Sequence, residues 1–338
     1  MYSGKRQSPP SEGWTHQHEV TRNVLCDAAG VGCGAATEQF RGPIVISPMN
    51  FFTIKDLENL SGIKAHTIRI WEQRYSFLKP KRSQTNIRYY ESDELKTLLN
   101  IALLNKYGFR ISQIDRMSPE TMKEKILSLE TAGAQQEITI NNLMHHMVEL
   151  DSEKFENILD NYIRQYGIDK TITQLIFPFL EKIGLLWLTD HVRVAQEHMV
   201  SSIIRQKLIT GTENISNLQE GTKYVVMFLP QGEFHELGLL YVQYLLKIRG
   251  TGILYLGADV PMEELEFVVK LKKPGYIYTH LTSVNGKFNF EKFLGTIGTR
   301  MKQTTLVVSG RIAQAYYNKP PYNVRLKNSL EDVITELG

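Results

Sequence analysis

The pattern of hydrophobic and polar positions divides the chain into successive segments of different character. Residues 1–48 show no apolar periodicity and are rich in small and polar residues, so we expect a disordered or non-native extension. Residues 49–130 contain short amphipathic stretches and a basic hairpin pattern, and residues 138–210 show the apolar spacing of longer helices. From residue 222 to 338, short apolar runs alternate with helical stretches. The pattern predicts a multidomain α and α/β protein.

The start of the first segment allows two interpretations. Met49 directly precedes the first periodic sequence, so it could be the true start, with residues 1–48 as an added extension. The alternative is a genuine flexible arm. In either case, the extension lacks the apolar core of a secretory signal.

Two short helices are expected from residue 53 onwards. Thr53 can cap the first helix. A tight turn at residues 61–63 leads to a second helix over residues 65–73, which would bury Ile68 and Trp71. This is the helix-turn-helix arrangement, whose second helix enters the major groove of DNA. The side chains left for outside contacts are His66, Thr67, Arg69, Arg74 and Tyr75.

A two-stranded wing is predicted over residues 76–90. Its ends are β-prone, its tip is polar, and it contains four basic residues and no acid. Residues 49–117 contain twelve Lys or Arg against seven Asp or Glu, a net charge of +5, while the whole chain carries only +3. Basic and polar side chains in such a wing suit contact with phosphates. A small helical domain with a solvated basic loop is the alternative.

Two runs carry a resemblance to a known family. Thr67-Ile-Arg-Ile-Trp-Glu72 and the later Arg88-Tyr-Tyr90 resemble the winged DNA-binding domain of MerR-type regulators, over about residues 51–120. The resemblance implies that the helix side chains named above lie at or near the groove, and that Lys81, Arg82 and Arg88 hold phosphates. It implies a double-stranded DNA operator as partner, with RNA polymerase as a further one. Both cysteines, Cys26 and Cys33, lie in the extension, so the branch that senses metals through C-terminal cysteines is excluded.

A helical bundle is expected next. Further helices over residues 91–107, 111–117 and 120–130 lead to a linker centred on residues 131–137, and residues 138–210 have the spacing of a four-helix bundle. Asp151 should cap one helix and Gly167 should end it.

The last segment predicts a doubly wound, flavodoxin-like or Rossmann-like parallel sheet. A connector near residues 211–222 precedes it. The expected strands cover residues 223–229, 251–256, 276–281, 304–309 and 323–326.

One strand-to-helix loop of this sheet carries candidate chemistry. Glu233 and His235 follow the first apolar strand, where parallel sheets bind ligands. Imidazole is the commonest side-chain metal ligand, and a carboxylate two residues away could fix its tautomer and orientation. Local pattern alone leaves open that this is a simple turn with an exposed histidine.

Glu233-x-His235-x-x-Gly238 resembles the Asp-x-His-x-x-Gly loop of cobalamin-binding domains, with Glu in place of Asp. The resemblance implies that His235 is the lower ligand of cobalt, that Glu233 orients it, and that Gly238 makes room for the nucleotide tail. Other loops match as well, with Thr in place of Ser and Ser-Gly in place of Gly-Gly. The matching positions are Gly257, Asp259, Val260, Thr279, Leu281, Ser309 and Gly310.

The helical segment is similar to the cap of cobalamin-dependent MerR-type regulators. In that cap, a tryptophan and a glutamate cover the upper face of the corrin and contact the adenosyl group, roles that the resemblance gives to Trp187 and Glu197, with His198 nearby. Light-sensing members have a histidine directly after the tryptophan. This chain has Leu188, which puts a second histidine ligand after photolysis in doubt, and His191 is a displaced substitute.

The combined pattern predicts a DNA-binding transcription regulator that senses adenosylcobalamin, with light acting through cobalt–carbon photolysis on a homo-oligomer, dimer or tetramer. A light-insensitive regulator and one without cobalamin dependence are alternatives. A mutase or methyltransferase subunit is disfavoured, because no length remains for a substrate barrel of about 250 residues. Hydrophobic content of 42% and charged content of 22% are typical of globular proteins, and no apolar run approaches the roughly 20 residues of a membrane span. We expect a cytoplasmic protein.

Overall fold

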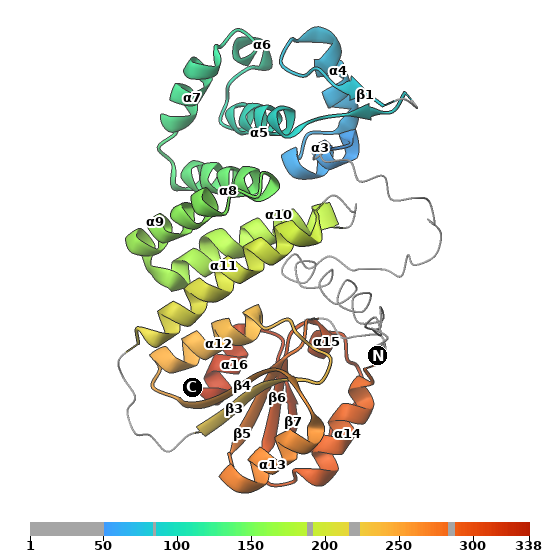
Figure 1. Cartoon of the computed structure of the whole chain (residues 1–338), viewed down its shortest axis with the longest axis vertical. Helices are drawn as coiled ribbons and strands as arrows, with labels where there is room; N and C mark the ends of the chain where they lie inside the picture. Colours follow the sequence, from blue (N-terminus) through green and yellow to red (C-terminus); the bar gives the residue numbers. More distant parts are fainter. Residues whose placement is uncertain (1–50, 84–85, 188–191, 216–223, 283–287) are drawn as a thin grey trace, which may run out of the picture. The chain divides into compact units, whose positions relative to one another are not determined.

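The computed structural model describes residues 51–83, 86–187, 192–215, 224–282 and 288–338 (Figure 1). The expectations for residues 1–48, Met49, Leu188 and His191 lie outside this part. Contacts divide the chain into two compact units, with the boundary between Ile203 and Ile204. The division into a DNA-binding domain at 49–130, a cap at 138–210 and a sheet domain at 222–338 stays a prediction.

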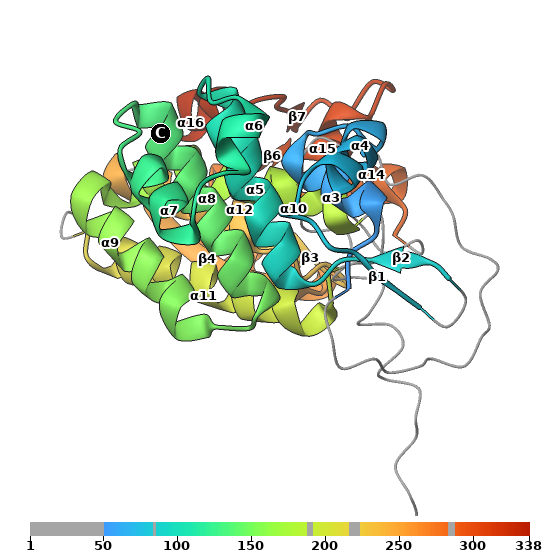
Figure 2. The ribbon, with the colours of Figure 1, turned by 90° about the horizontal axis from the view of Figure 1, so that it is seen from above.

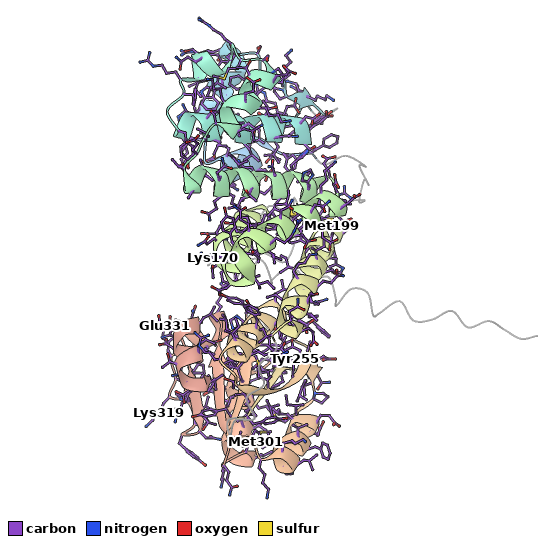
Figure 3. The ribbon with its side chains drawn as sticks, turned by 90° about the vertical axis from the view of Figure 1, so that its left-hand side faces the viewer. Lys170, Met199, Tyr255, Met301, Lys319 and Glu331 are labelled. Carbon is purple, nitrogen blue, oxygen red and sulfur yellow. The ribbon has the colours of Figure 1, made fainter. Side chains whose placement is uncertain are left out.

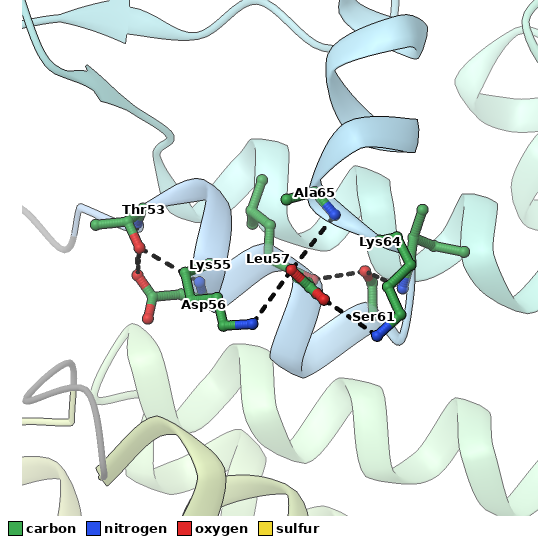
Figure 4. A network of polar contacts seen from close by, with 9 residues as sticks. Thr53, Lys55, Asp56, Leu57, Ser61, Lys64 and Ala65 are labelled. Carbon is green, nitrogen blue, oxygen red and sulfur yellow. Dashed lines mark hydrogen bonds and ion pairs between the residues drawn. The ribbon is translucent and has the colours of Figure 1, made fainter.

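Helix α3 (Ile54–Ser61) is capped by Thr53, as expected. The Thr53 side chain accepts from the backbone N–H of Asp56, whose carboxylate in turn accepts from the backbone of Thr53 at 2.6 Å (Figure 4). This reciprocal capping box satisfies two otherwise orphaned donors. The helix ends at Gly62, whose φ of 73° lies in the left-handed region that glycine adopts without strain.

The second helix, α4 (Ala65–Arg74), buries Ile68 and Trp71, which confirms the predicted inner face. After it, strands β1 (Lys81–Arg82) and β2 (Arg88–Tyr89) pair antiparallel as the wing, which extends beyond α3 and α5 in Figure 2. Two backbone hydrogen bonds between Phe52 and Tyr90, of 2.8 and 2.9 Å, fasten the wing to the start of the domain.

Helices α5 (Ser92–Lys106), α6 (Ile111–Ile114) and α7 (Pro119–Leu127) follow near their predicted positions. The prediction of an irregular linker at residues 131–137 is wrong, because α8 (Ala132–Val148) already begins there. Thr131 caps this helix by accepting from the N–H of Ala134 at 3.3 Å. The cap offsets the weak helix propensity of Gly133 in the first turn.

The bundle helices after α8 confirm two predicted signals. Asp151 caps α9 (Ser152–Lys170), and Gly167 interrupts it with a φ of 81°. A π-helical turn, η1 (Thr171–Ile176), then leads into α10 (Phe177–Trp187), and α11 (Val194–Glu213) is the last long helix before the sheet.

The sheet has five parallel strands in the order β4-β3-β5-β6-β7. Strand β4, which follows β3 in the chain, lies on one side of β3, and β5 lies on the other side. β3 and β5 therefore flank the topological switch point. This strand order confirms the predicted flavodoxin-like sheet. The strands are β3 (Tyr224–Pro230), β4 (Gly252–Val260), β5 (Tyr276–His280), β6 (Thr305–Ser309) and β7 (Val324–Leu326).

Helices cover both faces of this sheet (Figure 1). Alternate residues of β3 point to opposite faces, as in any strand: Val225 and Met227 pack with α12 and α16, and Val226 and Phe228 with α13 and α14. The helices are α12 (Leu237–Ile248), α13 (Met262–Lys272), α14 (Phe290–Arg300), the short α15 (Arg311–Gln314) and α16 (Leu330–Leu337).

Candidate functional site

The loop between β3 and α12 holds a buried carboxylate–imidazole pair. Glu233 Oε1 accepts from the backbone N–H of His235 at 2.8 Å and also contacts Nδ1 of the His235 ring. The two side chains are 2% and 5% exposed. A carboxylate that accepts from Nδ1 fixes the tautomer in which Nε2 carries the lone pair. The pair is therefore chemically suited to present Nε2 to a metal.

The backbone of this loop is fastened to the end of β4. The N–H of Gly232 donates to Asp259 Oδ1 at 2.8 Å, and the N–H of Asp259 donates to the Glu233 carbonyl at 3.1 Å. Gly257 has a φ of 82° at an irregularity of the β3–β4 register, and the next register pair joins Pro230 to Val260. Gly257, Asp259 and Val260 thus shape and hold the loop that carries His235.

Buried polar atoms without a hydrogen-bond partner among the described residues lie beside the switch point. They include Glu233 Oε2 and Thr279 Oγ1, from the loop after β3 and the end of β5. An unsatisfied buried polar group costs about 1–3 kcal/mol, so such atoms mark a place that a ligand or an ordered water completes. Their position agrees with ligand binding at the switch point of an open parallel sheet.

A second polar group lies at the ends of β5 and β6. Ser309 Oγ lies 2.8 Å from His280 Nδ1 and 2.7 Å from the Tyr278 hydroxyl. Burial lowers the pKa of His280 to about 4, so its ring is neutral near pH 7, and burial raises the pKa of Tyr278. Ser309, predicted to line a ligand tail, is hydrogen-bonded to the protein itself.

Gly238, predicted to make room for a tail, faces the His280 ring. A Cβ built on Gly238 would lie 2.4 Å from His280 Cδ2 and 2.7 Å from Nε2. The space that the glycine leaves therefore holds an imidazole in this structure. The sequence singled out the two residues that flank His280 but not His280 itself.

Gly310 and Leu281 bring β5 and β6 together. A Cβ on Gly310 would lie 2.4 Å from the Leu281 carbonyl oxygen, so only glycine permits this approach. The N–H of Leu281 donates to the Ser309 carbonyl at 2.8 Å, and the buried Leu281 side chain joins the core on the α13 and α14 face. Both residues support the edge of the site through packing.

A polar network that the sequence did not indicate braces the residue after His235. Arg205 Nε of α11 lies 2.8 Å from Glu236 Oε1, and the hydroxyl of Tyr255 donates to Glu236 Oε2 at 3.2 Å (Figure 3 labels Tyr255). Burial, with the nearby Glu236 carboxylate, raises the pKa of Tyr255. The network ties α11 and β4 to the start of α12.

The candidate residues of the helical segment differ in their surroundings. Glu197, on the first turn of α11, is 1% exposed, and neither carboxylate oxygen has a hydrogen-bond partner among the described residues. Burial raises the pKa of Glu197 to about 9. His198 is exposed, and Trp187 is the last residue of α10. Glu197 is therefore another buried polar group that lacks a hydrogen-bond partner in the described part of the chain.

The predicted DNA-contacting side chains of α4 are mostly exposed. His66, Arg69 and Arg74 are exposed, while Thr67 and Tyr75 are half-buried. Tyr75 stacks on Phe77, with ring centroids 5.5 Å apart and an interplanar angle of 14°. The outer face of α4 thus offers basic and polar groups, as the periodicity predicted.

The predicted wing cations lie among polar partners. Lys81 Nζ lies 2.6 Å from a Glu91 carboxylate oxygen, which raises the pKa of Lys81, and Arg88 lies 3.8 Å from Glu72. Arg82 donates to Asn86 Oδ1 at 2.7 Å. The wing contains no acid of its own, and its acidic partners come from the residues on either side of it.

Glu72 joins the second helix to the wing, a role that the sequence did not reveal. The fully buried Tyr90 hydroxyl donates to Glu72 Oε1, and Arg88 faces the other oxygen. Burial, with the hydrogen bond to Glu72, raises the pKa of Tyr90. The Trp-Glu and Arg-Tyr-Tyr runs are therefore two halves of one contact.

Comparison with known families identifies two parts of the chain. Residues 52–121 match the MerR HTH family regulatory protein model, and residues 139–210 match a B12 binding domain model. The chain thus contains a MerR-type helix-turn-helix segment followed by a B12-binding segment. The two matches confirm the two resemblances that the sequence carries, and the match to a regulatory-protein family agrees with the prediction of a regulator rather than an enzyme.

Two curated proteins of Myxococcus xanthus are similar to this chain. The HTH-type transcriptional repressor CarH is 26% identical over 258 residues, which cover 75% of this chain and 84% of CarH. The HTH-type transcriptional repressor CarA is 27% identical over 216 residues, which cover 63% of this chain and 70% of CarA.

Solved corrinoid proteins are also similar. The monomethylamine corrinoid protein of Methanosarcina barkeri is 12% identical, with a TM-score of 0.46, over 57% of this chain and 94% of that one. A cobalamin-binding protein of Desulfitobacterium hafniense is 14% identical, with a TM-score of 0.29, over 58% of this chain and 96% of that one.

Two further observations concern the described residues. No group of three or more His, Cys, Asp and Glu side chains among them is arranged to hold a metal ion. None of the described helices is long and apolar enough to cross a membrane.

Proposed function

We propose that this regulator senses adenosylcobalamin, and that light acts on it by cleaving the cobalt–carbon bond. The observation that carries the proposal is the buried Glu233–His235 pair at the switch point, on the same chain as a MerR-type helix-turn-helix. The names of CarH and CarA as transcriptional repressors support transcriptional control, with repression as its direction.

The residues of this chain fit a corrinoid. His235 would be the lower ligand through Nε2, Glu233 would hold the ring, and the loop bonds to Asp259 would keep both in place. Glu233 Oε2 and Thr279 Oγ1, which have no hydrogen-bond partner among the described residues, lie where a ligand is expected. When bound, the cofactor supplies a photolabile cobalt–carbon bond.

The helical segment would cover the upper side of the cofactor. Glu197 is a buried carboxyl group without a hydrogen-bond partner among the described residues, so a polar group of the adenosyl moiety would satisfy it. Trp187 would form the apolar part of this cover, with His198 nearby. Cofactor binding would join the cap at 138–210 to the sheet domain at 222–338, and loss of the adenosyl group would weaken the link.

This link gives a route to DNA. If the joined state favours a dimer or tetramer, several helix-turn-helix domains engage one operator together, and their affinities combine through a high effective concentration. His66, Thr67, Arg69, Arg74 and Tyr75 would read the operator or its backbone, with Lys81, Arg82 and Arg88 on phosphates. RNA polymerase is a further partner, and the expected location is the cytoplasm.

A light-insensitive cobalamin sensor is the second candidate. It is favoured by Leu188, which stands where light-sensing members have a histidine. This candidate keeps the corrinoid site and the DNA-binding surface, and loses only the response to illumination.

The experiment mixes the full chain with adenosylcobalamin in the dark. Its absorption spectrum and gel-filtration size are then recorded before and after green light. We expect a bound corrinoid and a light-dependent change of size. His235→Ala should change the spectrum of the bound corrinoid, and Glu233→Gln should weaken its binding by about 10- to 100-fold because the ring loses its orienting carboxylate. Glu264→Gln, an exposed change on α13, is the matched control.

The outcomes separate the candidates. Binding without a change of size on illumination would leave the light-insensitive sensor. If wild type and His235→Ala were equally unable to bind, the corrinoid part of the proposal would be wrong and only the DNA-binding role would stand.

A further inference from the structure

We propose that His280 slows the binding of corrinoids that carry a nucleotide tail, because its ring fills the space that the tail has to enter. The inference rests on the proposed function and concerns the same site. It makes His280 a specificity-determining residue, which discriminates between a corrinoid with a tail and one without.

The closure follows from the contact between β5 and α12. Gly238 lies on the first turn of α12, three residues after His235. The His280 ring fills the space beside it, because a Cβ built on Gly238 would lie 2.4 Å from His280 Cδ2. Any larger group that passes between these elements has to displace the ring. The crevice at the carboxyl ends of β3 and β5 is the expected ligand entrance.

A buried hydrogen-bond network holds the His280 ring in this position. Ser309 Oγ lies 2.8 Å from His280 Nδ1, and the Tyr278 hydroxyl lies 2.7 Å from the same Ser309 oxygen. Tyr278 and Ser309 are buried, at 0% and 2% exposed, so neither can replace this bond with water at no cost. Moving the ring therefore breaks at least one buried hydrogen bond.

The chemistry of a corrinoid explains why the tail is the affected part. If His235 takes the lower position on cobalt, the nucleotide base would lose that position and its tail would lie on the histidine side of the ring. The resemblance to cobalamin-binding loops then implies that the tail would enter beside Gly238, three residues after His235. A corrinoid that lacks the nucleotide has no group that must pass His280.

The test compares hydroxocobalamin, which has the tail, with aquocobinamide, which lacks it. Association rates and affinities are measured by stopped-flow absorption and titration on the full chain. We expect His280→Ala to speed the association of hydroxocobalamin by about two- to tenfold, the factor for one buried hydrogen bond, and to leave cobinamide unchanged. Ser309→Ala, which releases the ring without removing it, should give a smaller increase for hydroxocobalamin alone.

Unchanged cobinamide binding shows that each variant is folded. His146→Ala, in the helical segment, is the matched histidine control. The inference is overturned if His280→Ala and wild type bind both corrinoids alike, or if the variant binds hydroxocobalamin more slowly. Failure of the proposed function looks different, because wild type would then bind neither compound.

Discussion

At the scale of single residues, the Glu197 carboxyl group carries the clearest consequence of burial. It is 1% exposed, without a hydrogen-bond partner among the described residues, and burial raises its pKa from 4.5 to about 9. The unfolded chain releases this proton near its ordinary pKa, while the native protein keeps it. The native state therefore binds more protons than the unfolded state across the interval between these values.

The sign of the effect on stability follows directly. Stability from this group is fully present below about pH 4.5 and is lost as pH rises towards about pH 9. In Glu197→Gln, which cannot ionise, this loss is absent. We expect the cofactor-free variant to be more stable than wild type at pH 8 by about 1–3 kcal/mol, with little difference at pH 4.5. Thermal unfolding at a series of pH values measures this.

If the stability of wild type and that of Glu197→Gln changed with pH in parallel, Glu197 would be ionised in the native state and the prediction would be wrong. Glu153→Gln, an exposed change on α9, controls for the lost charge.

At the scale of elements, the contact between α4 and the wing determines how the DNA-binding surface is presented. Glu72 of α4 accepts from the buried Tyr90 hydroxyl and faces Arg88 of β2, 3.8 Å away. The backbone pair between Phe52 and Tyr90 and the ion pair between Lys81 and Glu91 also join the wing to the domain. Among these contacts, the hydrogen bond from Tyr90 to the Glu72 carboxylate is the one that ties the wing directly to α4.

Removing the Tyr90 hydroxyl tests this dependence. Tyr90→Phe should lower the free energy of unfolding by about 1–2 kcal/mol, because the buried carboxylate loses a donor. The variant should also bind DNA more weakly, since the wing is less firmly held. Urea unfolding followed by circular dichroism and a DNA titration give the two readouts.

Tyr89→Phe makes the same chemical change on the neighbouring residue, which is half-buried and packs against Phe51 with ring centroids 4.3 Å apart. It should leave stability within about 0.5 kcal/mol of wild type. If Tyr90→Phe and Tyr89→Phe lowered stability and DNA binding equally, the effect would not be specific to the hydrogen bond between Tyr90 and Glu72.

At the scale of the whole molecule, charge is distributed unevenly along the chain. The net charge is +5 over residues 49–117 and +3 over the whole chain, so the rest is slightly acidic. Cations that contact phosphates release counterions, and the affinity for DNA then falls linearly with salt concentration on a logarithmic scale. The slope counts the phosphate contacts.

Arg74 is an exposed cation at the end of α4. Arg74→Gln should reduce the slope by about one and weaken binding by a similar factor on unrelated DNA sequences. Lys170→Gln, an exposed change at the end of α9 (Figure 3), should leave the slope unchanged. Fluorescence anisotropy with a labelled DNA duplex at several salt concentrations measures the slope for each protein. Equal slopes for wild type and both variants would show that Arg74 does not contact DNA.

The sequence alone determined the order and type of the main elements. Thr53, Asp151 and Gly167 act on the backbone within a few residues, so their effect can be read locally. The alternation of apolar runs and helices likewise predicted the parallel sheet, and the loop after its first strand located His235. The linker predicted at residues 131–137 failed because Thr131 begins α8 there.

Only the tertiary structure decided which polar groups meet. Glu72 and Tyr90 lie 18 residues apart, and His280 and Ser309 lie 29 apart. No local pattern predicts such pairs, because they depend on how separate strands and helices pack. The same packing puts the His280 ring against Gly238 and leaves Glu197 buried without a hydrogen-bond partner in the described part of the chain. Local propensity and periodicity thus determine where helices and strands form. The packing of these elements determines which side chains far apart in the sequence are buried together, and so the chemistry of the site.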